Sequence, residues 1–284
     1  MTAPAPLFPP GRDEGPPAGA LVLGAYLRAL RRRVGLSLRQ ASLRIHRSAA
    51  MLSRYEMGIC TPTEQCLYVL LRAYGLSTRE DFEEARCVRR HAQDHVYRDA
   101  GGWLRGRVEA VEATALSSTV FTCSTIPPTL YSRAFTAYRA QADGGLLPPP
   151  RPRPCCPVTL FVEELVLGRP YGGPAVMAAQ LRYWADLSDS GDLEIRVMPP
   201  VDVPPQAGLL SELELPGNRR IWIDEDWIPA FSTGTAARSR AEAVQRARET
   251  ALSADSSLNV LHDAAEHWAT AAAASSTRST ACTR

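Results

Sequence analysis

Apolar residues recur at spacings of three and four near the start of the chain, which is the period of one helix face. Leu23, Leu27 and Leu30 follow this spacing from near Leu21 onward, and Gly35 ends the pattern. Glycine is typical of a helix C-terminus. The pattern therefore predicts an amphipathic helix that packs one face on a core.

Four more helices are predicted from residues that can cap a first turn. They run from Leu38 to about Ile45 after Ser37, from Ala49 to Met57 after Ser48, from Pro62 to Tyr74 after Thr61, and from the capping-box sequence Ser77-Thr78-Arg79-Glu80 to near Arg89. Five consecutive helices predict a compact helical domain over residues 21–100, after a disordered leader at residues 1–20.

The second half of the chain mixes helical patterns with short segments of period two. Helices are predicted at 104–118, 127–140, 176–187, 236–252 and 258–268, and strands at 119–123, 193–197, 209–215 and 220–224. The proline-rich segment 142–157 is predicted to be a loop. We expect an α+β domain over residues 101–269 with a small antiparallel sheet, followed by a disordered tail at residues 270–284.

The third predicted helix has two unlike faces when its residues are placed at roughly 100° intervals. Its apolar side chains gather on one face: Met51, Leu52 and Tyr55. The opposite face carries small, hydroxyl and cationic side chains: Ala49, Ala50, Ser53 and Arg54. Small side chains let a helix approach a groove floor, and an arginine can pair with a guanine edge. The helix alone leaves open the alternative of an ordinary capped core helix with a solvated outer face.

Basic residues concentrate around this helix, although the 284-residue chain has a formal net charge of only +2. Residues 20–60 hold eight arginines and one acid, whereas residues 155–230 hold twelve acids and five arginines. Arg39, Arg44, Arg47 and the cap residue Ser48 are candidate phosphate contacts, because they surround the short turn before the third helix. For any single arginine, a solvated or ion-paired side chain remains the alternative. Three helices joined in this way form a helix-turn-helix arrangement.

No catalytic or metal-binding pattern accompanies these features. The seven cysteines are irregularly spaced, Cys155 and Cys156 are adjacent, and His262 and His267 are five residues apart rather than four. There is no apolar run of eighteen residues and no secretory segment. We therefore expect a reduced, cytoplasmic protein without cofactor or metal, and not an enzyme.

Several motifs between Leu21 and Tyr74 are those of a known family. The helix-one sequence L-G-A-Y-L-R-A-L-R-R-R, the G-L-S junction, the S-R-Y-E-M-G ending and the T-P that follows resemble the helix-turn-helix module of phage-repressor-like regulators, the xenobiotic-response-element family. The resemblance implies a structural ion pair between Arg31 and Glu56. Two positions depart from the family pattern, since Leu38 stands in place of a polar residue and His46 in place of glycine.

The second half also resembles a known domain, through T-I-P-P-T-L-Y (125–131), P-Y-G-G-P-A-V-M-A-A-Q-L (170–181) and E-I-R-V-M-P (194–199). It looks like the C-terminal domain of unassigned function found in actinobacterial regulators of this type. Such regulators are treated as antitoxin-like partners of a small protein encoded beside them. This chain departs from the pattern at P-P-T-L-Y-S and in the proline-rich loop near residue 150.

These observations combine into one expectation of fold and function. The expected fold class is mainly α, with a five-helix helix-turn-helix domain before the α+β domain. We expect a sequence-specific, DNA-binding transcription regulator that inserts Ala49–Met57 into the major groove of double-stranded DNA as a homodimer. Its C-terminal domain would serve dimerisation, a partner or ligand sensing. The alternative is an antitoxin-like interaction protein that binds a small neighbour-encoded protein, with DNA binding secondary.

Overall fold

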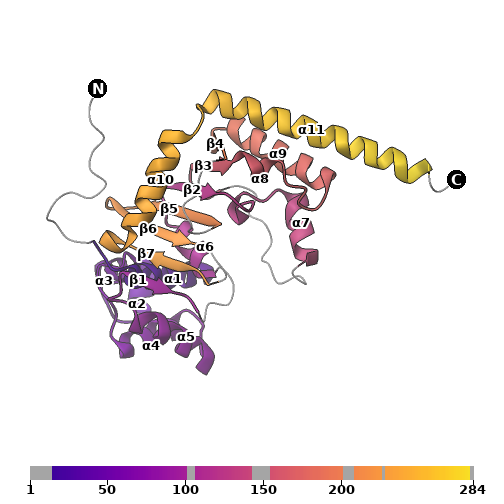
Figure 1. Ribbon diagram of the computed structural model, residues 1–284. Helices are drawn as coiled ribbons and strands as arrows, with labels where there is room; N and C mark the ends of the chain where they lie inside the picture. The colour runs from indigo at the N-terminus through magenta and orange to yellow at the C-terminus, as the bar shows by residue number, and fades with distance from the viewer. Residues whose placement is uncertain (1–14, 101–105, 143–153, 201–207, 226–227, 282–284) are drawn as a thin grey trace. The chain divides into compact units, whose positions relative to one another are not determined.

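The computed structural model of the chain describes residues 15–100, 106–142, 154–200, 208–225 and 228–281. The chain divides into two compact units, each built from two separate stretches. The first unit comprises Met1–Leu116 and Glu212–Glu242, and the second comprises Ser117–Ser211 and Ala243–Arg284. Figure 1 labels the helices and strands of both units.

Five helices open the first unit, as the sequence predicts (Figure 1). They are α1 (Ala18–Arg33), α2 (Leu38–Arg44), α3 (Ala49–Glu56), α4 (Glu64–Ala73) and α5 (Arg79–Arg90). Helix α1 begins three residues before the predicted Leu21, and the leader residues 1–14 lie outside the described residues. This added first turn packs closely against the end of α5, since a side-chain Cβ at Gly19 would lie 1.9 Å from the carbonyl oxygen of His91. Only glycine lets this first turn approach the end of α5 so closely.

Two predicted caps are confirmed and two are corrected. Ser37 and Ser48 cap α2 and α3 as predicted, each accepting a hydrogen bond from a backbone amide three residues on. Helix α4, however, begins after Thr63 rather than Thr61, because the Thr63 hydroxyl accepts from Cys66 N at 3.2 Å. The carbonyl of Pro62 instead accepts a hydrogen bond from the Arg89 side chain at 2.9 Å.

The capping box of α5 is likewise shifted by one residue from the predicted Ser77–Glu80 pair. Thr78 accepts a hydrogen bond from Asp81 N, and the Asp81 carboxylate accepts from Thr78 N, both at 3.1 Å. An aspartate side chain is shorter than glutamate and still closes the reciprocal pair. The Ser-x-x-Glu motif therefore gave the right helix with the wrong cap.

The first unit also contains α6, three short strands and part of a fourth. These elements are β1 (Val96–Arg98), α6 (Gly106–Glu112), the end of β5 (Leu209–Leu215), β6 (Arg219–Asp224) and β7 (Ala230–Ser232). Leu213, Ile221, Ile223 and Phe231 are buried in the same hydrophobic cluster as Leu23. These strands therefore complete the core of the first unit, which includes residues on both sides of the predicted boundary near residue 101.

The expected small antiparallel sheet is wrong. Within the described residues the strands form one seven-stranded mixed sheet in the order β1-β7-β6-β5-β2-β3-β4. The strands β2 (Ser117–Thr122), β3 (Val158–Glu163) and β4 (Leu193–Met198) pair in parallel, whereas β7 pairs antiparallel with β6 and β1. Helices connect β2 to β3 and β3 to β4, as parallel pairing requires.

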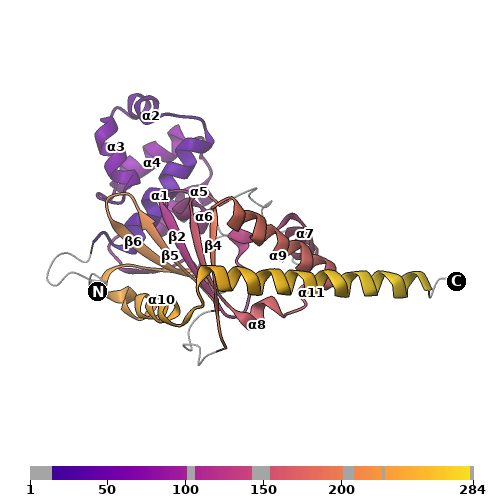
Figure 2. The same cartoon turned by 90° about the horizontal axis from the view of Figure 1, so that it is seen from above.

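The second unit surrounds the parallel strands with helices. They are η1 (Pro128–Leu130), α7 (Arg133–Ala142), α8 (Glu164–Leu167), α9 (Pro174–Asp189) and α11 (Ala254–Ala281), together with most of α10 (Arg238–Thr250). Helices α9 and α11 pack against each other and both contact β4 (Figures 1 and 2). The buried Gln180 side chain donates to Leu130 O and accepts from Ser132 N, both at 2.8 Å. Of the predicted loop 142–157, residues 143–153 lie outside the described residues.

The tail predicted to be disordered from residue 270 is helical as far as Ala281. Trp268 anchors this helix, since its indole nitrogen donates to Leu167 O at 2.8 Å. Alanine has the strongest helix propensity, so the alanine-rich segment that follows continues the helix. Among the described residues, none of the helices combines the length and the apolar character that crossing a membrane requires.

Candidate nucleic-acid interface

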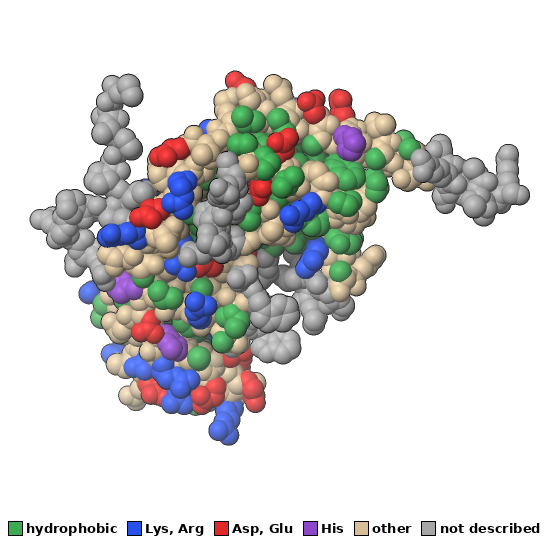
Figure 3. Space-filling model, in the orientation of Figure 1, with side chains coloured by type: hydrophobic (Ala, Val, Ile, Leu, Met, Phe, Trp, Pro, Cys, Tyr) green, Lys and Arg blue, Asp and Glu red, His purple; other side chains and the backbone are tan. Residues whose placement is uncertain are grey.

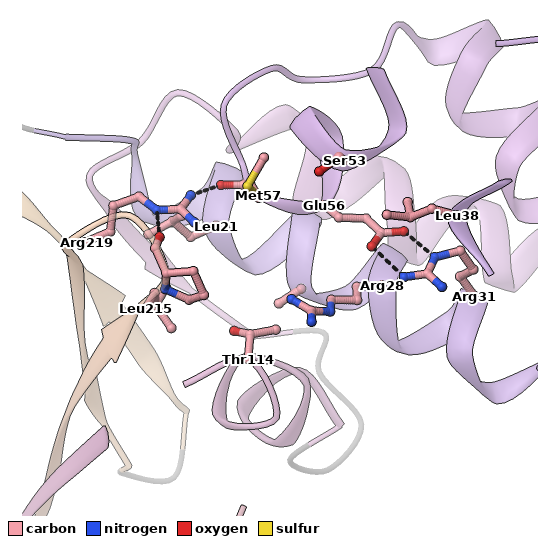
Figure 4. Close-up of a pocket in the computed structure, with 12 residues that line it drawn as sticks. Leu21, Arg28, Arg31, Leu38, Ser53, Glu56, Met57, Thr114, Leu215 and Arg219 are labelled. Atoms are coloured by element: carbon pink, nitrogen blue, oxygen red, sulfur yellow. Dashed lines mark hydrogen bonds and ion pairs between the residues drawn. The ribbon is translucent and has the colours of Figure 1, made fainter. Parts of the chain in front are cut away.

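Helix α3 is held on α1 by a buried ion pair and one buried leucine. Arg31 Nε and Nη2 donate to the two Glu56 carboxylate oxygens at 2.6 and 2.8 Å, which is the pair that the family resemblance implies (Figure 4). Arg31 Nη1 also donates to Leu36 O at 2.6 Å, and Leu52 is 1% exposed. The hydrogen-bonded Glu56 carboxylate raises the pKa of Arg31. These contacts fix the position of α3 and leave its opposite face available for contact with another molecule.

Glycine allows α1 and α3 to approach closely. A Cβ at Gly24 would lie 2.6 Å from Tyr55 O and 2.7 Å from Glu56 O, distances at which the backbone would have to move. Gly24 therefore sets the depth at which α3 sits on α1. Any larger side chain would push the helix outward.

The start of α3 presents hydrogen-bond donors. The Ser48 hydroxyl accepts from Met51 N at 3.2 Å, and the amides of Ala49 and Ala50 have no acceptor among the described residues. The turn before α3 contains His46 with φ of +52°, the left-handed conformation that glycine adopts most easily. Histidine thus reproduces the turn at the position where the family pattern has glycine. The amides at a helix start favour a negatively charged group.

The face of α3 opposite its core contacts is open. Ala50 and Arg54 are exposed, whereas Ala49 and Ser53 are half-buried. Leu52 and Glu56 face inward, while the predicted core residues Met51 and Tyr55 are only partly buried. No part of the described chain buries Arg54, so the surface predicted to contact bases is accessible.

The predicted phosphate contacts surround this open face as uncompensated charges. Arg39, Arg44 and Arg47 are exposed, and among the described residues their guanidinium groups have no hydrogen-bond or ion-pair partner. The surface of α4 and α5 differs, because Arg86 there pairs with Glu64 at 2.6 Å and with Glu83 at 2.9 Å. Figure 3 shows positive and negative side chains interspersed over that part of the first unit.

Sequence reasoning overlooked apolar and cationic residues beside this surface. Leu43 is 68% exposed on α2, one residue before Arg44, and Ile59 is 51% exposed just after α3. Arg28 and Arg219 line a pocket next to Ser53, although neither was singled out as a site residue. The long sequence separation between α1 and β6 carries no local signal of this proximity. Within the described residues, no group of three or more His, Cys, Asp or Glu side chains is placed to hold a metal ion.

Comparisons with known proteins match both halves of the chain. Residues 22–85 match the family described as "Helix-turn-helix domain", and residues 105–263 match the family described as "Domain of unknown function (DUF5753)". No curated protein matches the chain. One solved structure similar to it is that of the clp gene regulator ClgR from C. glutamicum, with 28% sequence identity and a TM-score of 0.23. That similarity covers 27% of this chain and 97% of the other.

Proposed function

The chain belongs to the family that shares the domain of unknown function DUF5753, and from this premise and its helix-turn-helix domain we propose that it is a sequence-specific, DNA-binding regulator of transcription. One observation carries the proposal. The outer face of α3 is open and is bordered by exposed arginines that lack partners among the described residues. An open surface with unpaired positive charges is typical of a face that binds a polyanion, rather than of one that packs inside a protein core.

The proposed base contacts divide according to their exposure. Arg54 projects from the open face and can donate two hydrogen bonds to a guanine edge. The small side chains of Ala49 and Ala50 allow α3 to lie close to the groove floor, where a methyl group can contact thymine. Ser53 is half-buried and would contact DNA only at the edge of the interface.

The proposed phosphate contacts contribute affinity without base preference. Arg39, Arg44 and Arg47 flank α3 on α2 and the turn, and Ser48 with the first amides of α3 can receive one phosphate. Each phosphate that an arginine neutralises releases counterions, so binding weakens as salt rises.

The test is a fluorescence-anisotropy titration of the full chain with the duplex upstream of its own coding sequence and with a scrambled duplex, over several salt concentrations. Arg54→Ala should reduce the difference between the two duplexes, because a bidentate arginine–guanine pair contributes about 1–3 kcal/mol of discrimination. Arg39→Ala should weaken both duplexes alike and reduce the salt slope by about one. Arg182→Ala, which removes one exposed arginine from α9 in the second unit, is the charge-matched control.

Equal effects of the Arg54→Ala and Arg182→Ala substitutions would contradict the role of α3 as the reading helix. The absence of any duplex bound more tightly than the scrambled one, in the upstream region or in a genomic selection, would contradict sequence-specific regulation altogether.

We further propose that the second unit makes the protein contacts of this regulator and that its first partner is a second copy of the chain. A single α3 reads only a few base pairs, and a dimer doubles the site. Leu165 on α8 is 52% exposed and is one apolar side chain that such a contact could cover. Light scattering of the purified chain should give the mass of a dimer. Monomers that instead form a stoichiometric complex with a small protein encoded next to the chain would favour the antitoxin-like function.

A further inference from the structure

A pocket of ≈310 Å³ lies inside the first unit, beside α3 (Figure 4). Its walls come from α1, the first residue of α2, the C-terminal half of α3, the segment just after α6, and the adjoining ends of β5 and β6 with the turn between them. The volume lies at the lower end of the range that small-molecule sites occupy. Leu21, Ala25 and Arg28 line it from one face of α1, at spacings of four and three residues.

Arg28 brings a positive charge without a directly contacting counter-charge into this pocket. Its side chain is half-buried and has no hydrogen-bond or ion-pair partner among the described residues. The nearby Glu56 carboxylate is already occupied, since both of its oxygens accept hydrogen bonds from Arg31. Burial, and then the neighbouring Arg32, lower the pKa of Arg28. Figure 4 shows the Arg28 guanidinium reaching into the space between Glu56 and Thr114.

Arg219, the first residue of β6, supplies a second guanidinium next to the β5–β6 turn. Its Nε donates to Pro216 O at 2.7 Å and its Nη1 donates to Met57 O, so the group is held in place by two carbonyl oxygens. The turn itself needs Gly217 and Asn218, whose φ angles of +84° and +56° suit these residue types. An arginine has five N–H donors, so several remain for a ligand. Burial lowers the pKa of Arg219, and no carboxylate pairs with it among the described residues.

The rest of the lining is largely apolar. Leu38, Met57 and Leu215 join Leu21 and Ala25 around the two guanidinium groups. A hydrated inorganic ion would leave these surfaces without a partner. An anionic group attached to an apolar body would satisfy both the arginines and the apolar walls.

We propose that this pocket binds a small organic anion, whose carboxylate or phosphate pairs with the Arg28 guanidinium and whose apolar body contacts Leu38, Met57 and Leu215, while Arg219 adds a second positive charge to the lining. Ser53 and Met57 belong to the pocket as well, so the ligand would touch α3 directly. Ligand binding would therefore change the affinity of α3 for DNA by linkage. The binding step stands without the proposed function, whereas the effect on DNA affinity rests on it.

The test is calorimetric titration of the full chain with benzoate and phenyl phosphate, compared with benzyl alcohol and inorganic phosphate. The two organic anions should bind saturably at millimolar concentrations, and the neutral alcohol and the bare ion should bind more weakly. Arg28→Gln should weaken the binding of both organic anions about 10-fold or more, as expected when a charge-assisted hydrogen bond is lost. Arg28 is preferred to Arg219 for this test, because Arg219 also holds the turn.

Two further variants separate the pocket from general charge. Arg32→Gln removes an exposed arginine four residues along α1 from Arg28 and should leave anion binding within about 2-fold. Thr114→Phe adds a ring to the half-buried position at the pocket wall and should abolish binding while every arginine is retained. Thermal unfolding of each variant checks that it remains folded.

Three outcomes would overturn the inference. These are failure of both organic anions to bind, equal weakening by the Arg28→Gln and Arg32→Gln substitutions, and unchanged binding in the Thr114→Phe variant. A fourth, in which only inorganic phosphate and duplex DNA depend on Arg28, would identify the pocket as a contact for the DNA backbone instead. Saturable binding of an organic anion without any DNA binding would uphold the site and contradict only the proposed function.

Discussion

Arg31 and Glu56 show how one residue pair positions a surface that neither residue forms. Their side chains are only 8% and 7% exposed, so each charge depends on the other for compensation. Only the family resemblance predicts this pairing, because the two residues stand 25 positions apart and nothing local in the sequence connects them. The arginines that lack partners are different, since the sequence gives their charge but not whether a carboxylate lies nearby.

Glu56→Gln should lower the free energy of unfolding by about 3–5 kcal/mol, because it leaves the buried Arg31 guanidinium without a counter-charge. Urea unfolding followed by circular dichroism measures the change. Glu64→Gln is the matched control, since Glu64 is 56% exposed and its pair with Arg86 should contribute less than about 1 kcal/mol. Equal losses in the two variants would contradict the structural role of the buried pair.

Buried tyrosines give the protein a dependence on alkaline pH. Burial is the largest cause that raises the pKa of both Tyr74 and Tyr97, followed by the nearby carboxylates of Glu56 and Asp99 respectively. In the unfolded chain both hydroxyls titrate near their ordinary pKa of 10.0. The folded state therefore binds more protons above that pH, and its stability should fall as pH rises beyond about 10.

Unfolding free energies measured by urea titration on either side of pH 10, together with tyrosinate absorbance, test this dependence. Tyr74→Phe should reduce the loss of stability at high pH, because it removes one of the hydroxyls that ionise in the unfolded chain. The substitution breaks no hydrogen bond, since Tyr74 donates none to a described residue. A loss of the same size in that variant would show that Tyr74 is not one of the groups responsible.

At the scale of elements, the sequence predicts helices better than strands. Caps and a period near 3.6 mark each of the first five helices, and these signals are local. Strand β3 was missed because it is buried almost throughout and reads as the apolar run V-T-L-F-V rather than as an alternating pattern. The two short strands β1 and β7 are three residues each, too short to show any period. Without β3 the parallel part of the sheet could not be predicted.

The corrected cap of α4 gives a direct test at this scale. Thr63→Ala should cost about 1 kcal/mol of stability, because the Thr63 hydroxyl accepts from Cys66 N. Thr61→Ala, at the residue that the sequence first suggested as the cap, should cost clearly less. Chemical unfolding of the two variants side by side measures the difference, and a larger loss for Thr61→Ala would restore the original assignment.

Neither of the two compact units is formed by a single continuous stretch of the chain. Each combines a first stretch with a later one, and the strand segment Glu212–Glu242 returns to the unit that contains the helix-turn-helix domain. Sequence patterns place a boundary where composition changes, near Gly101-Gly102, but they carry no information on which later segment completes a core. The shared hydrophobic cluster of Leu23, Ile223 and Phe231 is visible only in three dimensions.

A fragment that ends at residue 116 should therefore be less stable than the same helices in the full chain. It would expose the apolar surface of Leu21, Leu23 and Ala25 that the missing strands help to bury. Circular dichroism during heating should show a lower and broader transition for the fragment. A fragment that melts as sharply and as high as the full chain would show that the five helices and α6 form an independent domain.

The hydrogen bond from Arg219 to Met57 O has a consequence for synthesis of the protein. A ribosome that has finished α3 must still polymerise about 160 residues before Arg219 exists, which takes on the order of ten seconds or more at usual elongation speeds. Until then the last turn of α3 lacks the hydrogen bond from Arg219, and the pocket beside it lacks the residues that β5 and β6 contribute. Chains that terminate before Arg219 would thus contain the helix-turn-helix segment without the hydrogen bond that holds the C-terminal end of α3.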